Sequence, residues 1–195
     1  KMDDAPTICG FLSNVQGDYD FFEKYVEISR ILAWADESKA SLDLADSAYF
    51  VFGGNVQGTG QGDIRIARLL LDLKKKYPDR VKLLMGNMDI QLLKFSYLSN
   101  DSLCEDVEFK HSIPESVDSL QSKVRWLLQD LVGSDEPFEQ RRKELSLLSN
   151  SDDSQSISDE DVAASFTAQV LETGEDNLML RYLNEAQLAW IFGAT

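Results

Sequence analysis

Three polar turns follow three short apolar runs in the first half of this 195-residue chain. In chain order the turns read SNVQGD, GGNVQGTGQGD and GNMD. Asparagine and glutamine oxygens can bind a metal ion or accept a hydrogen bond, but they carry no charge. The glycines permit unusual backbone angles and close approach of a phosphate to backbone N–H groups. These residue types therefore suit a ligand site that lacks the expected charged side chains.

The elements that must position these turns alternate between strand and helix. Apolar runs predict strands at residues 7–13, 48–52 and 81–85. Amphipathic segments after the turns predict helices over YDFFEKYVEISRILAWA, capped by Asp18, over IRIARLLLDLKKKY, capped by Asp63 and stopped by Pro78, and over DIQLLKFSYL. Strands that are apolar throughout predict a parallel sheet covered by helices. The carboxyl ends of parallel strands share one edge, so we expect the three turns to converge.

The second half of the chain is helical in character. Four amphipathic segments predict helices: PESVDSLQSKVRWLLQDLV, EPFEQRRKELSLLS, DVAASFTAQVLETG and NLMLRYLNEAQLAWIF. A polar, acidic stretch at 150–161 reads as a loop or as a lead-in that caps the next helix. We predict one α/β domain, with an α/β region at 1–110 and a helical insertion or cap region at 111–195. An apolar stripe in the first helix could pack on the sheet or dock a partner; it contains Leu120, Val124, Leu127, Leu128 and Leu131.

The three turns, each at the end of a strand, resemble the motifs of the calcineurin-like metallophosphoesterase superfamily, which includes the serine/threonine protein phosphatases. That family carries Asp-x-His, Gly-Asp-x-x-Asp-x-Gly and Gly-Asn-His-Glu/Asp after successive strands. The corresponding text here is LSNVQG, GGNVQGTG and GNMD, within residues 7–95. The resemblance implies a parallel or mixed sheet covered by helices. In that family further ligand histidines come from later strands, so we expect that this chain could be a fragment of the full fold.

The resemblance also assigns roles to positions in the turns. Asn14 and Gln16 stand where the family has its first aspartate and histidine ligands, and Asn55 stands at the aspartate that bridges two metal ions. Asn87 keeps the expected ligand type, and Asp89 is retained. We expect Asn14, Gln16 and Asn55 to form a neutral, hydrogen-bonded cluster in place of a metal centre.

Two further positions depart from the family pattern. Thr59 stands at a phosphate-binding arginine, next to Gly58 at the second aspartate, and Met88 stands at the catalytic position after Asn87. A lost carboxylate a few ångströms from a divalent cation removes several kcal/mol of attraction, about 4 kcal/mol per unit charge at a surface-like dielectric. Metal binding, phosphate clamping and proton donation therefore fail together.

We therefore interpret the chain as a catalytically inactive metallophosphoesterase-like protein, a pseudophosphatase without a metal cofactor. It would serve as a structural or interaction module with protein partners, as in a multisubunit complex. One alternative is an active phosphoric ester hydrolase with an altered Mn, Fe or Zn dinuclear centre, completed by histidines beyond Thr195. Another is a nucleotide- or phosphate-sensing module that uses the backbone amides of GTGQGD. A third reading takes the asparagines as ordinary turn residues.

The composition of the chain limits the classes of partner and the compartments that we expect. The formal net charge is −15, with 34 acidic and 19 basic side chains, which argues against nucleic acid and anionic membranes as partners. No apolar run reaches the ~20 residues of a membrane span. Two cysteines do not make a disulfide framework, and one histidine, His111, does not make a histidine-rich metal site. We expect an intracellular protein, in the cytoplasm or in an organelle such as a plastid or mitochondrion.

Overall fold

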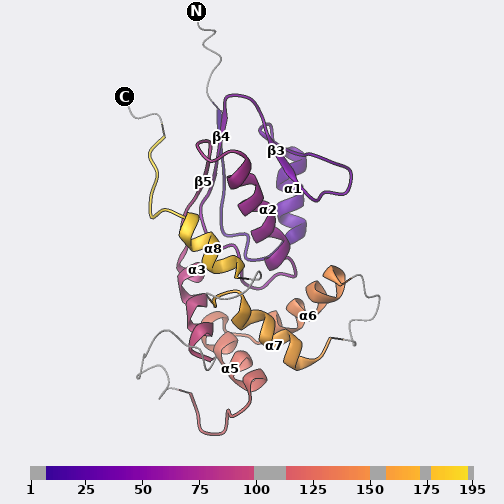
Figure 1. Ribbon diagram of the computed structural model, residues 1–195, viewed down its shortest axis with the longest axis vertical. Coiled ribbons are helices and arrows are strands. Elements are labelled where there is room, and N and C mark those ends of the chain that lie inside the picture. Colours follow the sequence, from indigo (N-terminus) through magenta and orange to yellow (C-terminus); the bar gives the residue numbers. More distant parts are fainter. Residues whose placement is uncertain (1–7, 99–112, 150–156, 172–176, 193–195) are drawn as a thin grey trace, which may run out of the picture.

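The computed structural model describes residues 8–98, 113–149, 157–171 and 177–192. A sheet with its helices occupies one end of the molecule, and α5, α6 and α7 occupy the other (Figure 1). The elements in chain order are β1 (Ile8–Leu12), α1 (Tyr19–Ile28), β2 (Leu32–Trp34), β3 (Leu42–Leu44), β4 (Ala48–Phe52), α2 (Asp63–Lys76), β5 (Val81–Leu83), α3 (Asn87–Gln91), the 3-10 helix η1 (Leu92–Leu98), α5 (Leu120–Val132), α6 (Glu136–Leu148), α7 (Asp159–Ala168) and α8 (Leu178–Glu185).

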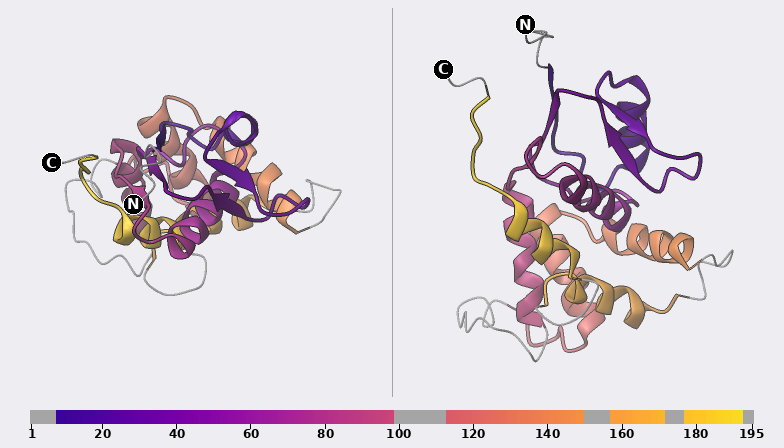
Figure 2. Two further views of the ribbon diagram at one scale, coloured as in Figure 1. Left: turned by 90° about the horizontal axis from the view of Figure 1, so that it is seen from above. Right: turned by 45° about the horizontal axis from the view of Figure 1, so that its top comes forward.

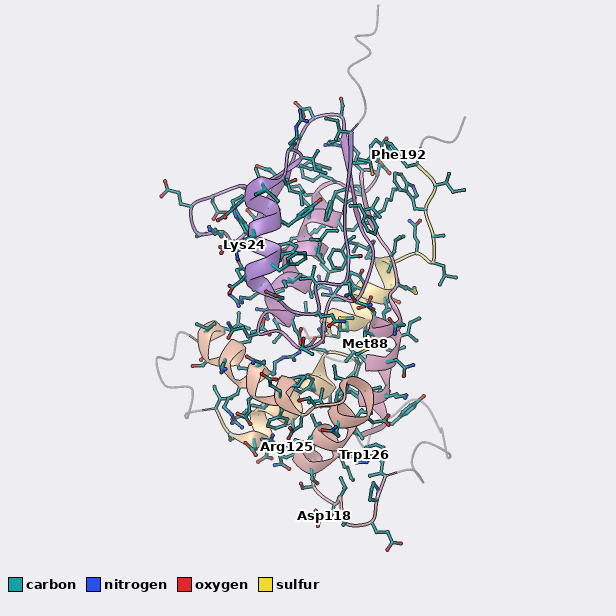
Figure 3. All side chains as sticks on the ribbon, turned by 180° about the vertical axis from the view of Figure 1, so that it is seen from behind. Lys24, Met88, Asp118, Arg125, Trp126 and Phe192 are labelled. Carbon is teal, nitrogen blue, oxygen red and sulfur yellow. The ribbon has the colours of Figure 1, made fainter. Side chains whose placement is uncertain are left out.

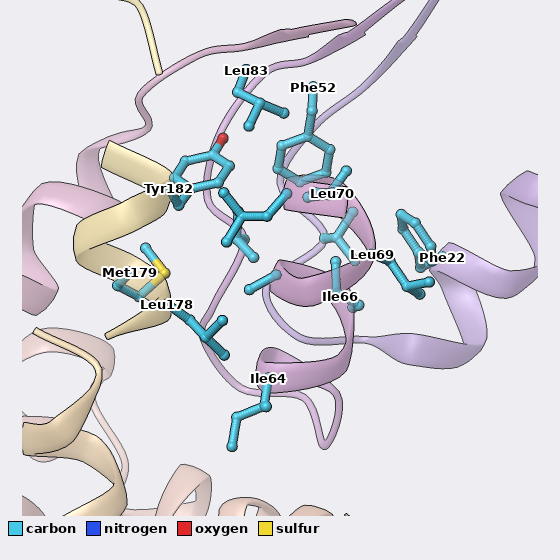
Figure 4. Close-up of a cluster of buried hydrophobic side chains, with 14 of the residues drawn as sticks. Phe22, Phe52, Ile64, Ile66, Leu69, Leu70, Leu83, Leu178, Met179 and Tyr182 are labelled. Atoms are coloured by element: carbon cyan, nitrogen blue, oxygen red, sulfur yellow. The ribbon is translucent and has the colours of Figure 1, made fainter. Parts of the chain in front are cut away.

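The main sheet confirms the predicted parallel arrangement. Its strand order is β1-β4-β5, and both pairs are parallel. Phe50 and Phe52 of the central strand are fully buried, as a parallel strand covered by helices requires. Figure 4 shows Phe52 beside Leu70 of α2 and Tyr182 of α8, in the same buried cluster as Phe22 of α1. The strands, α1, α2 and α8 therefore share one hydrophobic core.

A small antiparallel pair, β2 and β3, was not predicted, and the helix expected over residues 19–35 is shorter than the sequence suggested. Helix α1 ends at Ile28, where the Ser29 hydroxyl accepts hydrogen bonds from the backbone N–H groups of Ile31 and Leu32. These bonds turn the chain out of the helix into β2, which pairs with β3. Trp34, which the sequence placed on a helix, therefore lies on a strand.

Of the two predicted helix caps, one is confirmed and the other is wrong. Asp18 is the N-cap of α1, and its carboxylate accepts a bond from Phe21 N at 2.9 Å, as predicted. The prediction that Asp63 caps α2 is wrong, because Gly62 holds the N-cap position and Asp63 is the buried first helical residue. Three lysines occupy the last turn of α2, ahead of Pro78, as expected. The helix expected over DIQLLKFSYL is divided between α3 and η1.

The helical half packs mainly on itself and on η1. Helix α5 contacts α7 and η1, and α6 contacts α7 and α2. Of the predicted stripe, Val124, Leu127 and Leu128 are buried in this packing. The right view of Figure 2 shows the same helices beyond one end of the sheet. The stripe is therefore part of the core of the helical half and not a free face for a partner.

The chain leaves α8 at Glu185, earlier than the sequence predicted, and continues beside the sheet. Gln187 forms a parallel bridge with Leu84, next to β5. Trp190, which was expected on a helix, stacks on Tyr49 of β4 with ring centroids 5.7 Å apart. Within the described residues, no helix is both long and apolar enough to span a bilayer. His111, Cys104 and residues 150–156 of the acidic stretch lie outside them.

Candidate functional site

The three polar turns meet at the carboxyl ends of the strands, as predicted. The turn after β1 is bonded to the turn after β4 by backbone hydrogen bonds from Asn14 N to Gly54 O at 2.9 Å and from Gln16 N to Asn55 O at 2.9 Å. Gly17 N adds a third, to Val56 O at 2.8 Å. The two turns therefore form one continuous surface whose side chains must face each other.

The side chains on this surface form a network of amides. Asn14 Oδ1 accepts hydrogen bonds from Gln16 Nε2 at 3.1 Å and from Asn55 Nδ2 at 3.0 Å. Asn55 Oδ1 accepts from Met88 N at 3.0 Å, which ties the turn after β5 to the same group. We call Asn14, Gln16 and Asn55 the amide cluster. The expected neutral, hydrogen-bonded arrangement is therefore present, with no charged side chain among its three members.

The backbone of the amide cluster is unusual. Asn14, Gln16 and Asn55 all have positive φ angles, of 58°, 51° and 58°. Asparagine tolerates this left-handed conformation better than most residues, whereas glutamine has no such preference. Strained backbone of this kind persists only where the surrounding structure imposes it, and it concentrates at functional sites. Lys39 and Ser47, outside these turns, also have positive φ angles, of 56° and 58°, so the conformation by itself does not mark a functional site.

Asp89 is buried beneath the amide cluster and holds two turns together. Its carboxylate accepts backbone hydrogen bonds from Asn55 N and Gly86 N on one oxygen, at 2.8 and 2.9 Å, and from Val56 N on the other, at 2.9 Å. Burial raises the pKa of Asp89, although the three N–H donors oppose this shift. The retained aspartate is thus engaged with the backbone and organises the turns.

The other predicted positions lie at the margins of this surface. Asn87 is the exposed first residue of α3, and Met88 is partly buried. Thr59 is exposed and lines a hollow of about 240 Å³ that also contains Asp18 and Asp20. The residues described around this hollow include no lysine or arginine. The two carboxylates repel a phosphate, and Thr59 itself supplies no positive charge; the guanidinium of Arg65 stacks on Tyr19 and donates to Gln61 O at 2.9 Å, two residues that line the same hollow.

The N-terminus of α2, which the sequence suggested as a phosphate site, is filled by the protein itself. Glu144 Oε1, from α6, accepts hydrogen bonds from Ile64 N and Arg65 N, both at 3.0 Å. Asp63 Oδ1 accepts from Gly58 N at 3.2 Å. These donors and the positive end of the helix dipole are what would otherwise attract an anion. The carboxylate of Glu144 takes the place of that anion.

A buried ionic cluster lies where α6 of the helical half packs against α2 of the sheet region. Arg141 of α6 is 1% exposed and donates to Asp63 Oδ2 at 2.9 Å, with Glu144 Oε2 3.7 Å from its Nε. Burial, aided by the negative charge of Glu144 and opposed by Arg141, raises the pKa of Asp63 to about 7. Sequence analysis missed Arg141 and Glu144 because charged residues in an amphipathic helix normally face solvent.

The donor set does not fit the dinuclear metal centre that the resemblance implies. Among the described residues, no three histidine, cysteine, aspartate or glutamate side chains gather closely enough to hold an ion. The amide oxygens of Asn14 and Asn55 already accept hydrogen bonds, and the carboxylate of Asp89 is occupied by backbone N–H groups. Comparison of the chain with protein-family models, with curated proteins and with solved structures found no match.

Proposed function

We propose that this protein is a catalytically inactive, metallophosphoesterase-like module that acts through protein partners inside the cell. The observation that supports this proposal most directly is the amide cluster at the junction of the three turns. Asn14 Oδ1 and Asn55 Oδ1, the oxygens that could face an ion, accept hydrogen bonds from Gln16 Nε2, Asn55 Nδ2 and Met88 N. These hydrogen bonds support the proposal that the amide cluster is held together by the chain's own groups.

The chemistry of phosphoester hydrolysis explains why such a network would be inactive. Two-metal catalysis needs charged ligands to hold the ions and a positively charged group to stabilise the equatorial oxygens in the transition state. An ion entering here would have to break the hydrogen bonds to Asn14 Oδ1 and Asn55 Oδ1, and it would gain no negative charge in return. The hollow that Thr59 lines also contains the carboxylates of Asp18 and Asp20 at the start of α1, and Thr59 supplies no cation to bind a phosphate.

The experiment is metal analysis combined with turnover. The purified chain is dialysed against Mn²⁺, its metal content is measured by elemental analysis, and hydrolysis of p-nitrophenyl phosphate is followed in the same buffer. We expect substoichiometric metal and no turnover above the buffer rate. Two bound ions per chain, with turnover that disappears in Asn87→Ala, would overturn the proposal. Asn55→Asp, which restores one carboxylate in the same backbone, is the matched variant and should bind Mn²⁺ more tightly than the parent chain.

The proposal that the protein acts through protein partners has a separate test. The size of the protein in an extract of its own cells is compared with the size of the purified chain by native gel separation and immunodetection. A partner-dependent module migrates as a larger species in the extract. Migration identical to that of the purified chain at every extract concentration would refute an interaction role, whatever the metal analysis shows.

A further inference from the structure

A second feature of the molecule, separate from the amide cluster, is a hollow of about 520 Å³ between the last turn of α2 and helix α8. The two helices pack against each other and lie side by side in Figure 1. Three cations line the hollow, Lys74 and Lys75 of α2 and Arg181 of α8, together with one carboxylate, that of Glu185. We call this site the basic hollow. None of the amide cluster residues lines it.

Two of the three cations have no ionic partner. Lys75 and Arg181 are exposed, and neither forms an ion pair with Glu185 or with any other residue that the structure describes. Cations elsewhere do pair with carboxylates, as Lys76 does with Asp43. The chain has 34 acidic and 19 basic side chains, so a group of cations without carboxylate partners is unexpected in it. The dipole of α2 favours lysines in its last turn, but it does not account for an arginine on the neighbouring helix.

The environment of Lys74 shows that the nearby carboxylates do not balance the positive charge. Its ammonium group donates to two backbone oxygens, of which Pro78 O is 2.7 Å away, and these hold its position without neutralising it. Burial, and then the positive charge of Lys82, lower the pKa of Lys74, although the carboxylates of Glu185 and Asp79 oppose this shift. An anion in the basic hollow would therefore meet uncompensated positive charge.

We propose that the basic hollow binds a small phosphorylated polyol, such as a sugar phosphate, with its phosphate held by Lys75 and Arg181. Guanidinium and ammonium groups are the side-chain donors that proteins use to bind phosphate. Asn184 and Glu185, which line the same hollow, offer an amide and a carboxylate that can hydrogen-bond the hydroxyl groups of a polyol. The volume of the hollow lies within the ~300–1,000 Å³ that is usual for small-molecule sites.

The lining disfavours other phosphate-bearing ligands. The residues described around the basic hollow include no aromatic ring on which a nucleobase could stack. Leu71 and Pro78 are the hydrophobic residues among them, which is little surface for an acyl chain. The net charge of −15 repels an anionic membrane, but salt screens charges more than about 8 Å away from a small ligand. The proposal does not depend on whether the amide cluster is catalytic.

The test is a calorimetric titration of the purified chain with glucose 6-phosphate, inorganic phosphate and glucose. We expect glucose 6-phosphate to bind, inorganic phosphate to bind about tenfold more weakly, and glucose to give no binding heat. Lys75→Gln and Arg181→Gln should each weaken glucose 6-phosphate binding about tenfold, because each removes a charge-assisted hydrogen bond. Asn184→Ala should weaken binding of glucose 6-phosphate and leave inorganic phosphate unchanged, because only the hydroxyl groups lose a partner.

The matched controls are Lys24→Gln and Arg30→Gln, which remove the same charges from exposed side chains outside the basic hollow. Figure 3 labels Lys24 on α1, away from α8. Both controls should bind glucose 6-phosphate like the parent chain, and all four charge variants should fold normally because the replaced side chains are exposed. An equal loss in the controls, unchanged binding in Lys75→Gln and Arg181→Gln, equal affinity for glucose 6-phosphate and inorganic phosphate, or no binding heat with either would each overturn the proposal.

Discussion

Replacement of Arg141 by methionine tests whether the buried ionic cluster fastens the helical half to the sheet region. Methionine matches much of the volume of the arginine side chain but removes its charge. The change leaves Asp63 and Glu144 buried without the guanidinium that lies 2.9 Å from one carboxylate and 3.7 Å from the other. Removing one partner of a buried ion pair costs about 3–5 kcal/mol, because the remaining charge stays desolvated.

The loss in the free energy of unfolding caused by Arg141→Met should depend on pH, because the pKa of Asp63 differs between the folded and unfolded chain. Burial raises its folded-state pKa to about 7, above the value in an unfolded chain. The neutral carboxyl group therefore favours folding; this contribution is complete below about pH 4 and is lost as the pH rises through about 7. Without Arg141 the pKa of Asp63 rises further. At pH 5 the Asp63 carboxyl group is neutral with or without Arg141, whereas at pH 8 the parent holds it as a paired carboxylate and the variant must bury an unpaired charge or protonate it, so the penalty is larger at pH 8.

Urea unfolding followed by circular dichroism measures this effect at pH 5 and at pH 8. We expect Arg141→Met to lower the free energy of unfolding by about 3–5 kcal/mol at pH 8 and by clearly less at pH 5. Lys143→Met, in the same helix but exposed, is the control and should change stability by about 0.5 kcal/mol or less. A loss below about 1 kcal/mol at pH 8, or the same loss at both pH values, would refute this account of the junction.

Three other substitutions test the turns. Asp89→Asn presents an amide N–H₂ to backbone donors, so thermal unfolding should show a loss of about 2–3 kcal/mol, and an unchanged midpoint would contradict the clamp. Gly54→Ala combines a φ of 87° with a Cβ only 2.2 Å from a backbone nitrogen, whereas Gly133→Ala has a φ of 78° and open space. The first should therefore cost several times the ~1 kcal/mol of the second in urea unfolding, and equal costs would exclude the clash as the cause. Tyr182→Phe removes the hydrogen bond to Leu84 O and should lower the free energy of unfolding by about 1 kcal/mol; a neutral or stabilising result would show that this bond contributes nothing.

The part of the fold that the sequence predicted is the part set by local pattern. The runs that became β1, β4 and β5 are apolar apart from Lys82, and the parallel pairing follows from their alternation with helices. Convergence of the turns followed from the same topology. The predicted length of the first helix was wrong because a polar side chain outweighs the apolar spacing. The Ser29 hydroxyl accepts hydrogen bonds from Ile31 N and Leu32 N, which ends α1 although the next residues continue a helical spacing.

The junction could not be predicted because it depends on contacts distant in sequence. Asp63 and Arg141 are 78 residues apart, and Glu144 reaches Ile64 across 80 residues. A single sequence gives no sign that these charges are buried, since arginine and glutamate on a helix usually remain in solvent. Asp63 even has a local explanation as a helix cap, which the structure replaces with an ion pair.

The amide cluster lies near the start of the GGNVQGTGQGD turn, and the buried ionic cluster lies at its end. Both provide hydrogen-bond partners for polar groups of this turn. Every such turn brings backbone donors and polar side chains to the carboxyl ends of the strands, where they need partners. On one side Asn14 and Asn55 satisfy each other with neutral groups; on the other the carboxylate of Glu144 occupies the N-terminus of α2. In both cases the hydrogen-bond partners come from the chain itself. The positive φ angles of the amide cluster are then a property of the scaffold, which the hydrogen bonds stabilise in this form.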